Sequence, residues 1–275
     1  MRVPLPDGIK YAKVKALTEG RNLNTICISG NCPNKAECWS KGTATFMILG
    51  EKCTRNCGFC QVITMKPDKV DPGEAQTLAL AIFEMQLKHA VITSVCRDDI
   101  PDGGASVWAN TISVVKEKNP GLTMEVLIPD FMGKNSDLDK VIKAKPEVIS
   151  HNLETVHRLT SGLRSVASYE KSMEVLRYLV SAEVITKTGI MVGLGESEEE
   201  VKETMRDARE AGVNIFTIGQ YLQPSPKHHP IIEFVKPSVF PEYRKYGKEI
   251  GFDYIESSPL VRSSYNAEKH INIQK

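Results

Sequence analysis

The chain has 275 residues, of which 41% are hydrophobic and 25% are charged, and this is enough to build one sizeable core. Its 35 basic and 34 acidic residues leave a formal charge of +1, so the composition does not indicate a nucleic-acid-binding surface. No apolar run is long enough to span a bilayer, and the first 20 residues lack the apolar segment of a secretory signal. We therefore expect a cytoplasmic protein that binds neither nucleic acid nor a membrane.

A regular alternation of strands and helices begins at residue 43. Residues 1–42 contain scattered Gly and Pro with little periodicity, and they predict an irregular arm or a small cap on the main domain. Short apolar runs then predict strands at 43–49, 90–95, 122–128, 148–152, 185–192 and 214–218. Helical periodicity and capping signals predict helices at 74–88, 105–118, from the N-cap candidate Ser136, at 168–182, from Ser197 to Gly212 and near 241–250.

The alternation predicts an α/β fold. Six β/α units of about thirty residues each favour a parallel sheet with right-handed crossovers. The region 43–222 is short for a complete eight-unit barrel, which needs roughly 200–250 residues. A partial (β/α)6 TIM-type barrel and an open doubly wound sheet both fit this region. We expect an N-terminal extension at 1–42 and a C-terminal extension at 223–275 to flank it.

Cysteine usage points to metal ligation. The chain has seven cysteines, and six of them lie between Cys27 and Cys60. An odd number in a chain without an export signal argues against a disulfide framework. Close clustering in a reducing compartment is typical of metal ligands.

The segment Cys53-Thr-Arg-Asn-Cys57-Gly-Phe-Cys60 directly follows the first predicted strand. In barrel-type α/β folds, active sites are built at that end of the strands. Three thiolates suit a [4Fe–4S] cluster and leave one of its four irons open to a substrate or cofactor. Structural zinc is the alternative, but zinc ribbons usually show two separated C-x2-C pairs.

A second triplet lies upstream, as Cys27, Cys32 and Cys38 with C-x4-C-x5-C spacing. It could hold a second cluster, again with one ligand missing. A zinc site completed by a distant residue is the alternative.

The pattern of Cys53, Cys57 and Cys60 after a strand resembles the radical S-adenosylmethionine (SAM) superfamily. The resemblance implies that the open iron binds the amino and carboxylate groups of SAM. An electron from the cluster then splits the sulfonium, and the 5′-deoxyadenosyl radical abstracts hydrogen from an unactivated carbon.

One family in that superfamily, lipoyl synthase, is similar over nearly the whole chain. The motifs that carry the resemblance are Cys27–Trp39, Gly50-Glu-Lys-Cys53, Arg97-Asp-Asp-Ile-Pro-Asp-Gly-Gly104, Asn152-Leu-Glu-Thr-Val156, Met191-Val-Gly-Leu-Gly-Glu196, Gly219-Gln-Tyr-Leu-Gln-Pro224 and Arg262-Ser-Ser-Tyr265. They occur in the order that the family shows, which makes the resemblance specific. We expect one α/β domain, a partial (β/α)6 barrel with N- and C-terminal extensions.

The family resemblance implies two [4Fe–4S] clusters, with the upstream triplet and Ser264 holding an auxiliary cluster that is consumed as the sulfur donor. It implies insertion of sulfur at C6 and C8 of an octanoyl group, with cleavage of two SAM molecules. The implied partners are octanoylated lipoyl domains of a dehydrogenase complex (E2) or the glycine-cleavage carrier protein, with ferredoxin or flavodoxin as reductant. From the residues alone, Ser264 would be an ordinary turn residue.

Candidate SAM contacts follow the predicted strands, and each has a structural alternative. Gly103 and Gly104 stand where relatives carry Gly-Gly-Glu, but Ala105 replaces the Glu, so backbone carbonyls would serve; turn geometry is the alternative. The other candidates are Asn152 and Glu154 for the ribose or methionine, Arg164 for the carboxylate, and Gly193, Gln220 and Leu222 for the adenosine. The alternatives are helix capping for Asn152, a solvated surface position for Arg164, loop geometry for Gly193 and core packing for Leu222.

Two other functions stay open. Another sulfur-inserting enzyme of the superfamily would lack the upstream triplet and the terminal serine. A two-cluster electron carrier would usually ligate each cluster with four cysteines. Cys96, His228 and His229 receive no catalytic role.

Overall fold

The computed structural model describes residues 5–269, which form two compact units. The first unit comprises 5–54, 61–131 and 136–147, and the second comprises 55–60, 132–135 and 148–269. No helix within 5–269 combines the length and apolar character needed to cross a membrane.

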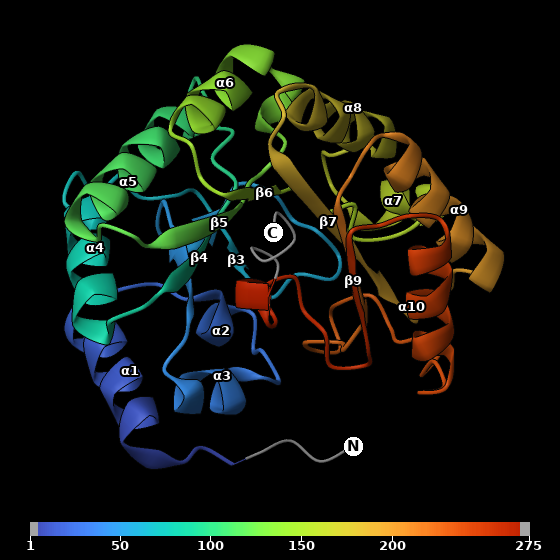
Figure 1. Cartoon of the computed structure of the whole chain (residues 1–275), viewed down its shortest axis with the longest axis horizontal. Coiled ribbons are helices and arrows are strands. Elements are labelled where there is room, and N and C mark those ends of the chain that lie inside the picture. The colour runs from blue at the N-terminus through green and yellow to red at the C-terminus, as the bar shows by residue number, and fades with distance from the viewer. Residues whose placement is uncertain (1–4, 270–275) are drawn as a thin grey trace. The chain divides into compact units, whose positions relative to one another are not determined.

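The first unit contains α1 (Gly8–Gly20), α2 (Ile26–Ser29), α3 (Lys35–Lys41), β1 (Thr45–Ile48), β2 (Lys52–Cys53), β3 (Ile63–Thr64), α4 (Glu74–Met85), β4 (His89–Ser94), α5 (Ala105–Lys118), β5 (Thr123–Leu127) and nearly all of α6 (Asn135–Lys143). Strands β1, β4 and β5 pair in parallel in that order, with Phe46 opposite Ile92 and Ile92 opposite Val126. These three side chains are buried, as expected for strands that are covered on both faces. Helices α4 and α5 lie outside β4 and β5 (Figure 1).

The expectation of an irregular arm at 1–42 is wrong, because this stretch forms α1, α2 and α3. Helix α1 packs on α3, where the rings of Tyr11 and Trp39 lie 5.5 Å apart. The glycines that suggested irregularity stand at helix ends. Gly8 and Gly20 bound α1, and Gly42 closes α3 with a left-handed φ of 89°.

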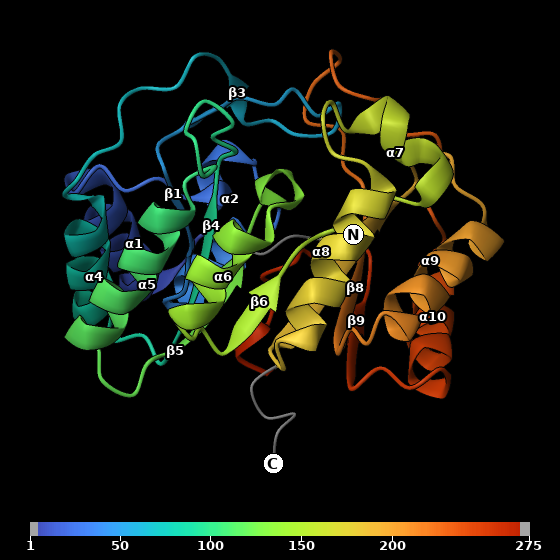
Figure 2. The ribbon, with the colours of Figure 1, turned by 90° about the horizontal axis from the view of Figure 1, so that it is seen from above.

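The second unit contains β6 (Val148–Ser150), α7 (His157–Leu163), α8 (Tyr169–Ser181), β7 (Ile185–Val192), α9 (Glu198–Glu210), β8 (Ile215–Gln220), α10 (Val239–Glu249) and β9 (Tyr254–Ser257), and the 3-10 turn η1 (Phe131–Gly133) is shared with the first unit. Strands β6, β7, β8 and β9 pair in parallel in that order. Figure 2 shows β8 beside β9 and α9 beside α10.

Strand β9 was not expected. Apart from the short parallel pair β2–β3, the parallel strands within 5–269 number three in the first unit and four in the second, against six in total from the sequence. Its four residues alternate in burial and include Glu256, so no apolar run marks it. The α/β class and the strand–helix alternation are confirmed, with one strand added from the C-terminal segment.

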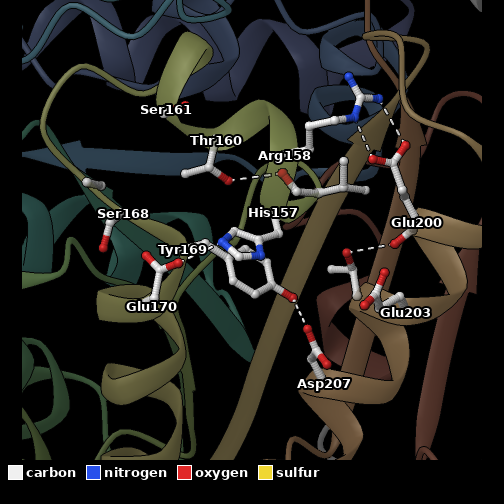
Figure 3. A pocket seen from close by; sticks show the side chains of 13 residues that line it. His157, Arg158, Thr160, Ser161, Ser168, Tyr169, Glu170, Glu200, Glu203 and Asp207 are labelled. Carbon is white, nitrogen blue, oxygen red and sulfur yellow. Dashed lines mark hydrogen bonds and ion pairs between the residues drawn. The ribbon is translucent and has the colours of Figure 1, made fainter.

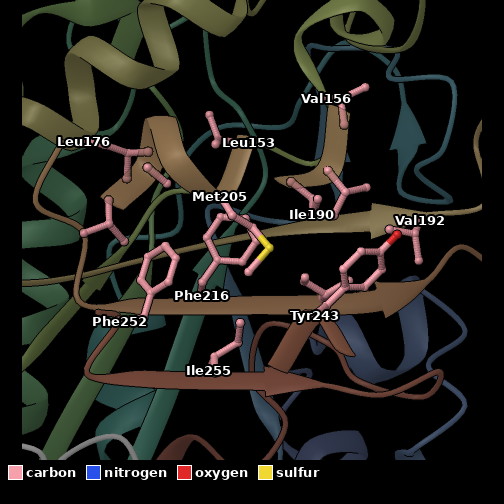
Figure 4. Packing of buried hydrophobic residues seen from close by; sticks show 14 of the residues in the cluster. Leu153, Val156, Leu176, Ile190, Val192, Met205, Phe216, Tyr243, Phe252 and Ile255 are labelled. Atoms are coloured by element: carbon pink, nitrogen blue, oxygen red, sulfur yellow. The ribbon is translucent and has the colours of Figure 1, made fainter. Parts of the chain in front are cut away.

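Apolar side chains of α8, α9, α10 and the strands form the core of the second unit (Figure 4). Met205, Phe216, Tyr243 and Phe252 pack together there, and the rings of Phe216 and Phe252 lie 5.3 Å apart. Burying each such ring contributes roughly 1.5–3 kcal/mol.

Capping residues set the starts of two outer helices. Ser197 and Glu200 form the predicted capping box of α9, and Ser168 accepts from the Lys171 amide at the start of α8. Ser136 is not an N-cap, because α6 already begins at Asn135.

Candidate active site

The carboxyl end of β1 leads into the C-x3-C-x2-C segment through a tightly held turn. Leu49 and Gly50 both have left-handed φ values, of 68° and 91°. The Glu74 carboxylate accepts from the Leu49 amide at 2.8 Å and the Gly50 amide at 3.4 Å. The buried Arg97 guanidinium donates to Leu49 O at 3.2 Å, to Asp68 O at 3.0 Å and to the Asp99 carboxylate at 2.9 Å. Arg97 therefore fastens the turn that precedes Cys53.

Cys53 itself is held from β4. The Cys96 amide, just after that strand, donates to Cys53 Sγ at 3.3 Å. The Thr54 amide and hydroxyl both donate to Cys96 O at 3.1 Å. Cys96 thus contacts the first cysteine of the segment through its backbone, a contact that the sequence did not predict.

Cys57 and Cys60 lie in the second unit, in a loop whose backbone is held by two histidines. The Gly58 carbonyl accepts from the His229 amide at 2.8 Å, and the Cys60 carbonyl accepts from His228 Nε2 at 3.0 Å. Because a carbonyl can only accept, His228 Nε2 carries a proton, and Nδ1 accepts from the Ser225 hydroxyl at 2.8 Å. No role was predicted for these histidines, and their Pro-flanked loop was the only signal available in the sequence.

The upstream triplet lies in the first unit, on α2, α3 and the loop between them. Cys27 is 5% exposed, and all seven cysteines of the chain are thiols. Burial, with smaller contributions from the charges of Cys27 and Cys32, raises the pKa of Cys38 to about 12. Burial also raises the pKa of Cys27, with a smaller contribution from Cys32. Within 5–269, no three His, Cys, Asp or Glu side chains already converge as ligands of a single ion.

These pKa shifts describe three thiols that oppose one another's ionisation. Only a nearby positive charge makes three thiolates favourable at neutral pH, because ligating sulfur must be deprotonated. The donor set therefore fits an iron–sulfur cluster.

Gly103 and Gly104 close the loop that leads from β4 into α5. Their φ values are 60° and 89°, and a Cβ at Gly104 would stand 2.5 Å from Leu49 Cδ1. Asp102 accepts from the Gly104 amide at 3.0 Å and from Lys140 at 2.8 Å. Burial would raise the pKa of Asp102, but the Lys140 and Ser106 hydrogen bonds outweigh it and lower the pKa. The glycines here meet a steric requirement of the turn.

Polar side chains gather after β6 in the second unit. Asn152 Nδ2 donates to Glu154 Oε1 at 3.2 Å and to Ser263 Oγ at 2.7 Å, while Asn152 Oδ1 is buried and has no hydrogen-bond partner among residues 5–269. Burial raises the pKa of Glu154, and the Arg164 charge counteracts this. Arg164 donates to Ser172 Oγ at 2.8 Å and to Asn152 O at 3.4 Å, so it is not merely a solvated side chain. Helix capping does not explain Asn152, because α7 begins five residues later, at His157.

The loop after β7 and the end of β8 are interlocked. A Cβ at Gly193 would stand 2.2 Å from Gln220 Nε2, so only glycine fits. Gln220 is 3% exposed and its amide is fully used. It donates to Tyr221 O at 3.1 Å and Glu233 O at 3.0 Å, and it accepts from the Val235 amide at 2.9 Å. The Gln220 side chain is therefore a structural clamp, and Leu222 beside it is 37% exposed.

A separate cavity of about 410 Å³ lies among α7, α8 and α9, where His157 stacks on Tyr169 and Arg158 pairs with Glu200 (Figure 3). The Tyr169 hydroxyl donates to Asp207 at 2.7 Å, and burial followed by this carboxylate raises the pKa of Tyr169. None of the predicted site residues lines this cavity.

Comparison with known proteins agrees with this geometry. The model of the radical SAM superfamily matches residues 47–208. Lipoyl synthase from Flavobacterium johnsoniae is 55% identical over 272 residues, covering 98% of this chain and 94% of its own. The mitochondrial lipoyl synthase of Nematostella vectensis is also 55% identical, covering 99% of this chain and 93% of its own.

Among solved structures, a methylornithine synthase superposes with a TM-score of 0.59 and 14% identity, covering 90% of this chain and 77% of its own. At that identity the likeness concerns the fold alone. It confirms the predicted partial-barrel α/β class.

Proposed function

The chain belongs to the lipoyl synthase family of radical SAM enzymes, and from this premise we propose how its residues divide the work of sulfur insertion. The family's reaction places sulfur at C6 and C8 of a protein-bound octanoyl-lysine, with a [4Fe–4S] cluster and SAM as cofactors. The roles of single residues and the second cluster are our proposal.

We assign Cys53, Cys57 and Cys60 as ligands of the SAM-binding cluster. When bound, this cluster supplies the electron that converts SAM to methionine and a 5′-deoxyadenosyl radical. The chain's own part is to hold the three sulfurs. Arg97 and Glu74 fix the turn before Cys53, and His228 and His229 fix the backbone from Gly58 to Cys60. The Cys96 amide stabilises negative charge on Cys53 Sγ, which makes a ligated cluster easier to reduce.

We assign Cys27, Cys32, Cys38 and Ser264 to an auxiliary [4Fe–4S] cluster that donates the sulfur. Cys27, Cys32 and Cys38 lie close enough for their charges to interact, which supports a shared role as ligands of one group. A serine alkoxide is the exceptional ligand in this set. The Ser264 hydroxyl has no hydrogen-bond partner within 5–269, which leaves it available, whereas the Ser263 hydroxyl accepts from Asn152.

We assign SAM binding to groups that follow the strands. Asn152 Oδ1 is the observation that supports this best, because a buried acceptor without a partner is costly unless a ligand donates to it. Glu154 is placed to accept from ribose hydroxyls, and Arg164 to pair with the methionine carboxylate. Gly103, Gly104, Gly193, Gln220 and Leu222 would contribute backbone groups, because the Gln220 side chain is already engaged.

The substrate is an octanoyl group on a carrier lysine, and for the carrier we propose the lipoyl domains of dehydrogenase-complex E2 proteins and the glycine-cleavage carrier protein. Ferredoxin or flavodoxin is the reductant we propose, because the cluster electron must come from outside the chain. Seven unlinked thiols suit a reducing compartment, and we propose the cytoplasm. For domain limits we propose an extension at 1–42, the radical SAM region at 43–222 and a C-terminal extension at 223–275.

Two cysteine triplets carry this proposal, and anaerobic turnover tests it. The protein is reconstituted with iron and sulfide and supplied with SAM, dithionite and an octanoyl-lysine peptide, and the products are followed by mass spectrometry. We expect 5′-deoxyadenosine and a peptide that gains first one sulfur and then two. Formation of 5′-deoxyadenosine without a sulfurated peptide would show that the sulfur-donor assignment is wrong. If the fully reconstituted protein formed neither product, both cluster assignments would be refuted.

A further inference from the structure

Ser263, the residue before the proposed cluster ligand, is held by two side chains of the second unit. Asn152 Nδ2 donates to its hydroxyl at 2.7 Å, and Lys187 Nζ donates to its backbone carbonyl. Lys187 lies in the middle of β7 and is 0% exposed. A buried ammonium is costly to desolvate, and the hydrogen bond to the Ser263 carbonyl offsets part of that cost.

The two adjacent serines therefore have different surroundings. The hydroxyl and carbonyl of Ser263 are both engaged, whereas in the described part of the chain the Ser264 hydroxyl makes no hydrogen bond. Fixing the carbonyl of one residue restricts the peptide plane that leads to the next. The clamp on Ser263 thus limits the directions that the Ser264 hydroxyl can take.

We propose that Lys187 and Asn152 are positioning residues that hold Ser263 so that the hydroxyl of Ser264 is presented to the auxiliary cluster. This inference rests on the proposed function, in which Ser264 is the fourth ligand. If the segment that carries Ser264 were flexible, it would lose conformational entropy each time the alkoxide bound iron. The hydrogen bonds from Lys187 and Asn152 to Ser263 order that segment before binding and so remove most of this cost.

The clamp also joins the two cofactor sites through Asn152. Its Nδ2 is shared between Ser263 and Glu154, and its Oδ1 is the unpartnered acceptor assigned above to SAM. Lys187 Nζ donates to the Ser263 carbonyl at this junction. Replacing Lys187 therefore tests the positioning of Ser264, and 5′-deoxyadenosine formation by the same variant tests SAM binding.

The test uses the full-length chain with Cys53, Cys57 and Cys60 replaced by Ala, reconstituted with ⁵⁷Fe so that only the auxiliary cluster is present. In a [4Fe–4S] cluster with three thiolate ligands, about one quarter of the Mössbauer absorption belongs to the iron that serine holds. We expect Lys187→Met to reduce this oxygen-ligated component about tenfold, the usual effect of losing one charged hydrogen bond. Ser263→Ala, which keeps the carbonyl and removes only the Asn152 bond, should reduce it less.

Lys116→Met is the matched control, because Lys116 Nζ also donates to a backbone carbonyl, that of Lys145, but in the first unit. It should leave the oxygen-ligated component unchanged. In the chain with all cysteines intact, Lys187→Met should keep SAM cleavage to 5′-deoxyadenosine while the doubly sulfurated product falls. A structural defect would lower both.

Ser264→Ala separates the two possible failures. If it leaves the Mössbauer spectrum unchanged, Ser264 is not a ligand and the proposed function fails at that residue. If Ser264→Ala removes the component while Lys187→Met and Ser263→Ala both retain it, the ligand stands and the positioning inference is overturned. Should Lys187→Met fail to fold by circular dichroism, Ser263→Ala decides, because it removes one small, half-buried hydroxyl from a turn and leaves β7 intact.

Discussion

Gln220 belongs to the Gly219–Pro224 motif, and its substitution tests whether its side chain stabilises the fold or contacts a ligand. The Gln220→Glu substitution keeps the size and replaces an NH2 group by an oxygen. In the native structure that NH2 group faces the carbonyl oxygens of Tyr221 and Glu233, at 3.1 and 3.0 Å. The substitution therefore removes two hydrogen bonds and sets a carboxylate oxygen against two carbonyls at a position that is 3% exposed.

The magnitude follows from those contacts. Each buried acceptor left unsatisfied costs about 1–3 kcal/mol, so we expect Gln220→Glu to lower the free energy of unfolding by about 3–5 kcal/mol at pH 8. Protonation of the new carboxyl restores one donor. Its pKa should be raised in the folded protein above the usual value of about 4.3, so the folded state binds the proton more tightly than the unfolded state. The stability deficit should accordingly shrink as the pH falls from 8 to 5.

Urea unfolding of the apoprotein at pH 8 and pH 5, followed by circular dichroism, measures both effects. Gln223→Glu is the matched control, because Gln223 makes one bond, to His228 O at 3.0 Å, from a less buried position. A Gln220→Glu deficit no larger than that of Gln223→Glu, or one independent of pH, would refute the clamp. A normal unfolding profile with weakened SAM binding would point instead to direct ligand contact.

Three further predictions concern the proposed site. Ser264→Cys should still assemble the auxiliary cluster but release sulfur more slowly, because a thiolate holds iron more firmly than an alkoxide; full activity in single-turnover mass spectrometry would contradict this. Burial raises the pKa of Glu154, so its ionised form destabilises the folded state above that raised pKa, and this cost is absent below the pKa of Glu154 in the unfolded state. Glu154→Gln should therefore stabilise the apoprotein by about 1 kcal/mol at pH 8 and have little effect at pH 4. Urea unfolding at the two pH values measures the difference. His228→Leu removes the hydrogen bonds of the imidazole to Cys60 O and to the Ser225 hydroxyl, at 3.0 and 2.8 Å, and should lower 5′-deoxyadenosine formation by about tenfold. His228→Gln can donate at the same place and should recover most of that activity. Equal rates in the two variants would show that the loop does not depend on this bond.

Burial explains which parts of the fold were predictable. The strand at 90–95 corresponds to β4, since an apolar run covered on both faces is the clearest sequence signal of a parallel strand. The strand at 185–192 corresponds to β7, in which only the first residue and the last three are apolar. Strand β9 was missed because its half-buried residues alternate with polar ones. Helix α1 was missed because its apolar face is short, with Val14 and Thr18 as its buried residues.

The candidate site divides in the same way. Cysteine spacing predicts both triplets, because thiolate ligands can come only from cysteine side chains. Their supports could not be read from the sequence. Lys187 stands in the strand Ile-Thr-Lys-Thr-Gly-Ile-Met-Val, and its complete burial is seen only in the structure. The clamp formed by Gln220 depends on Glu233 and Val235, more than ten residues away along the chain.

The hydrogen bond to Cys53 Sγ has a consequence for how this protein can diverge. The donor is the main-chain amide of Cys96, so it persists when that residue is exchanged for any amino acid except proline. Drift at position 96 would therefore leave the contact untouched, and the odd cysteine of this chain has no need to be inherited by descendants. A hydrogen bond that affects the electronic properties of the proposed cluster can therefore be maintained without any constraint on the side chain at position 96. The only sequence requirement that it imposes there is the absence of proline.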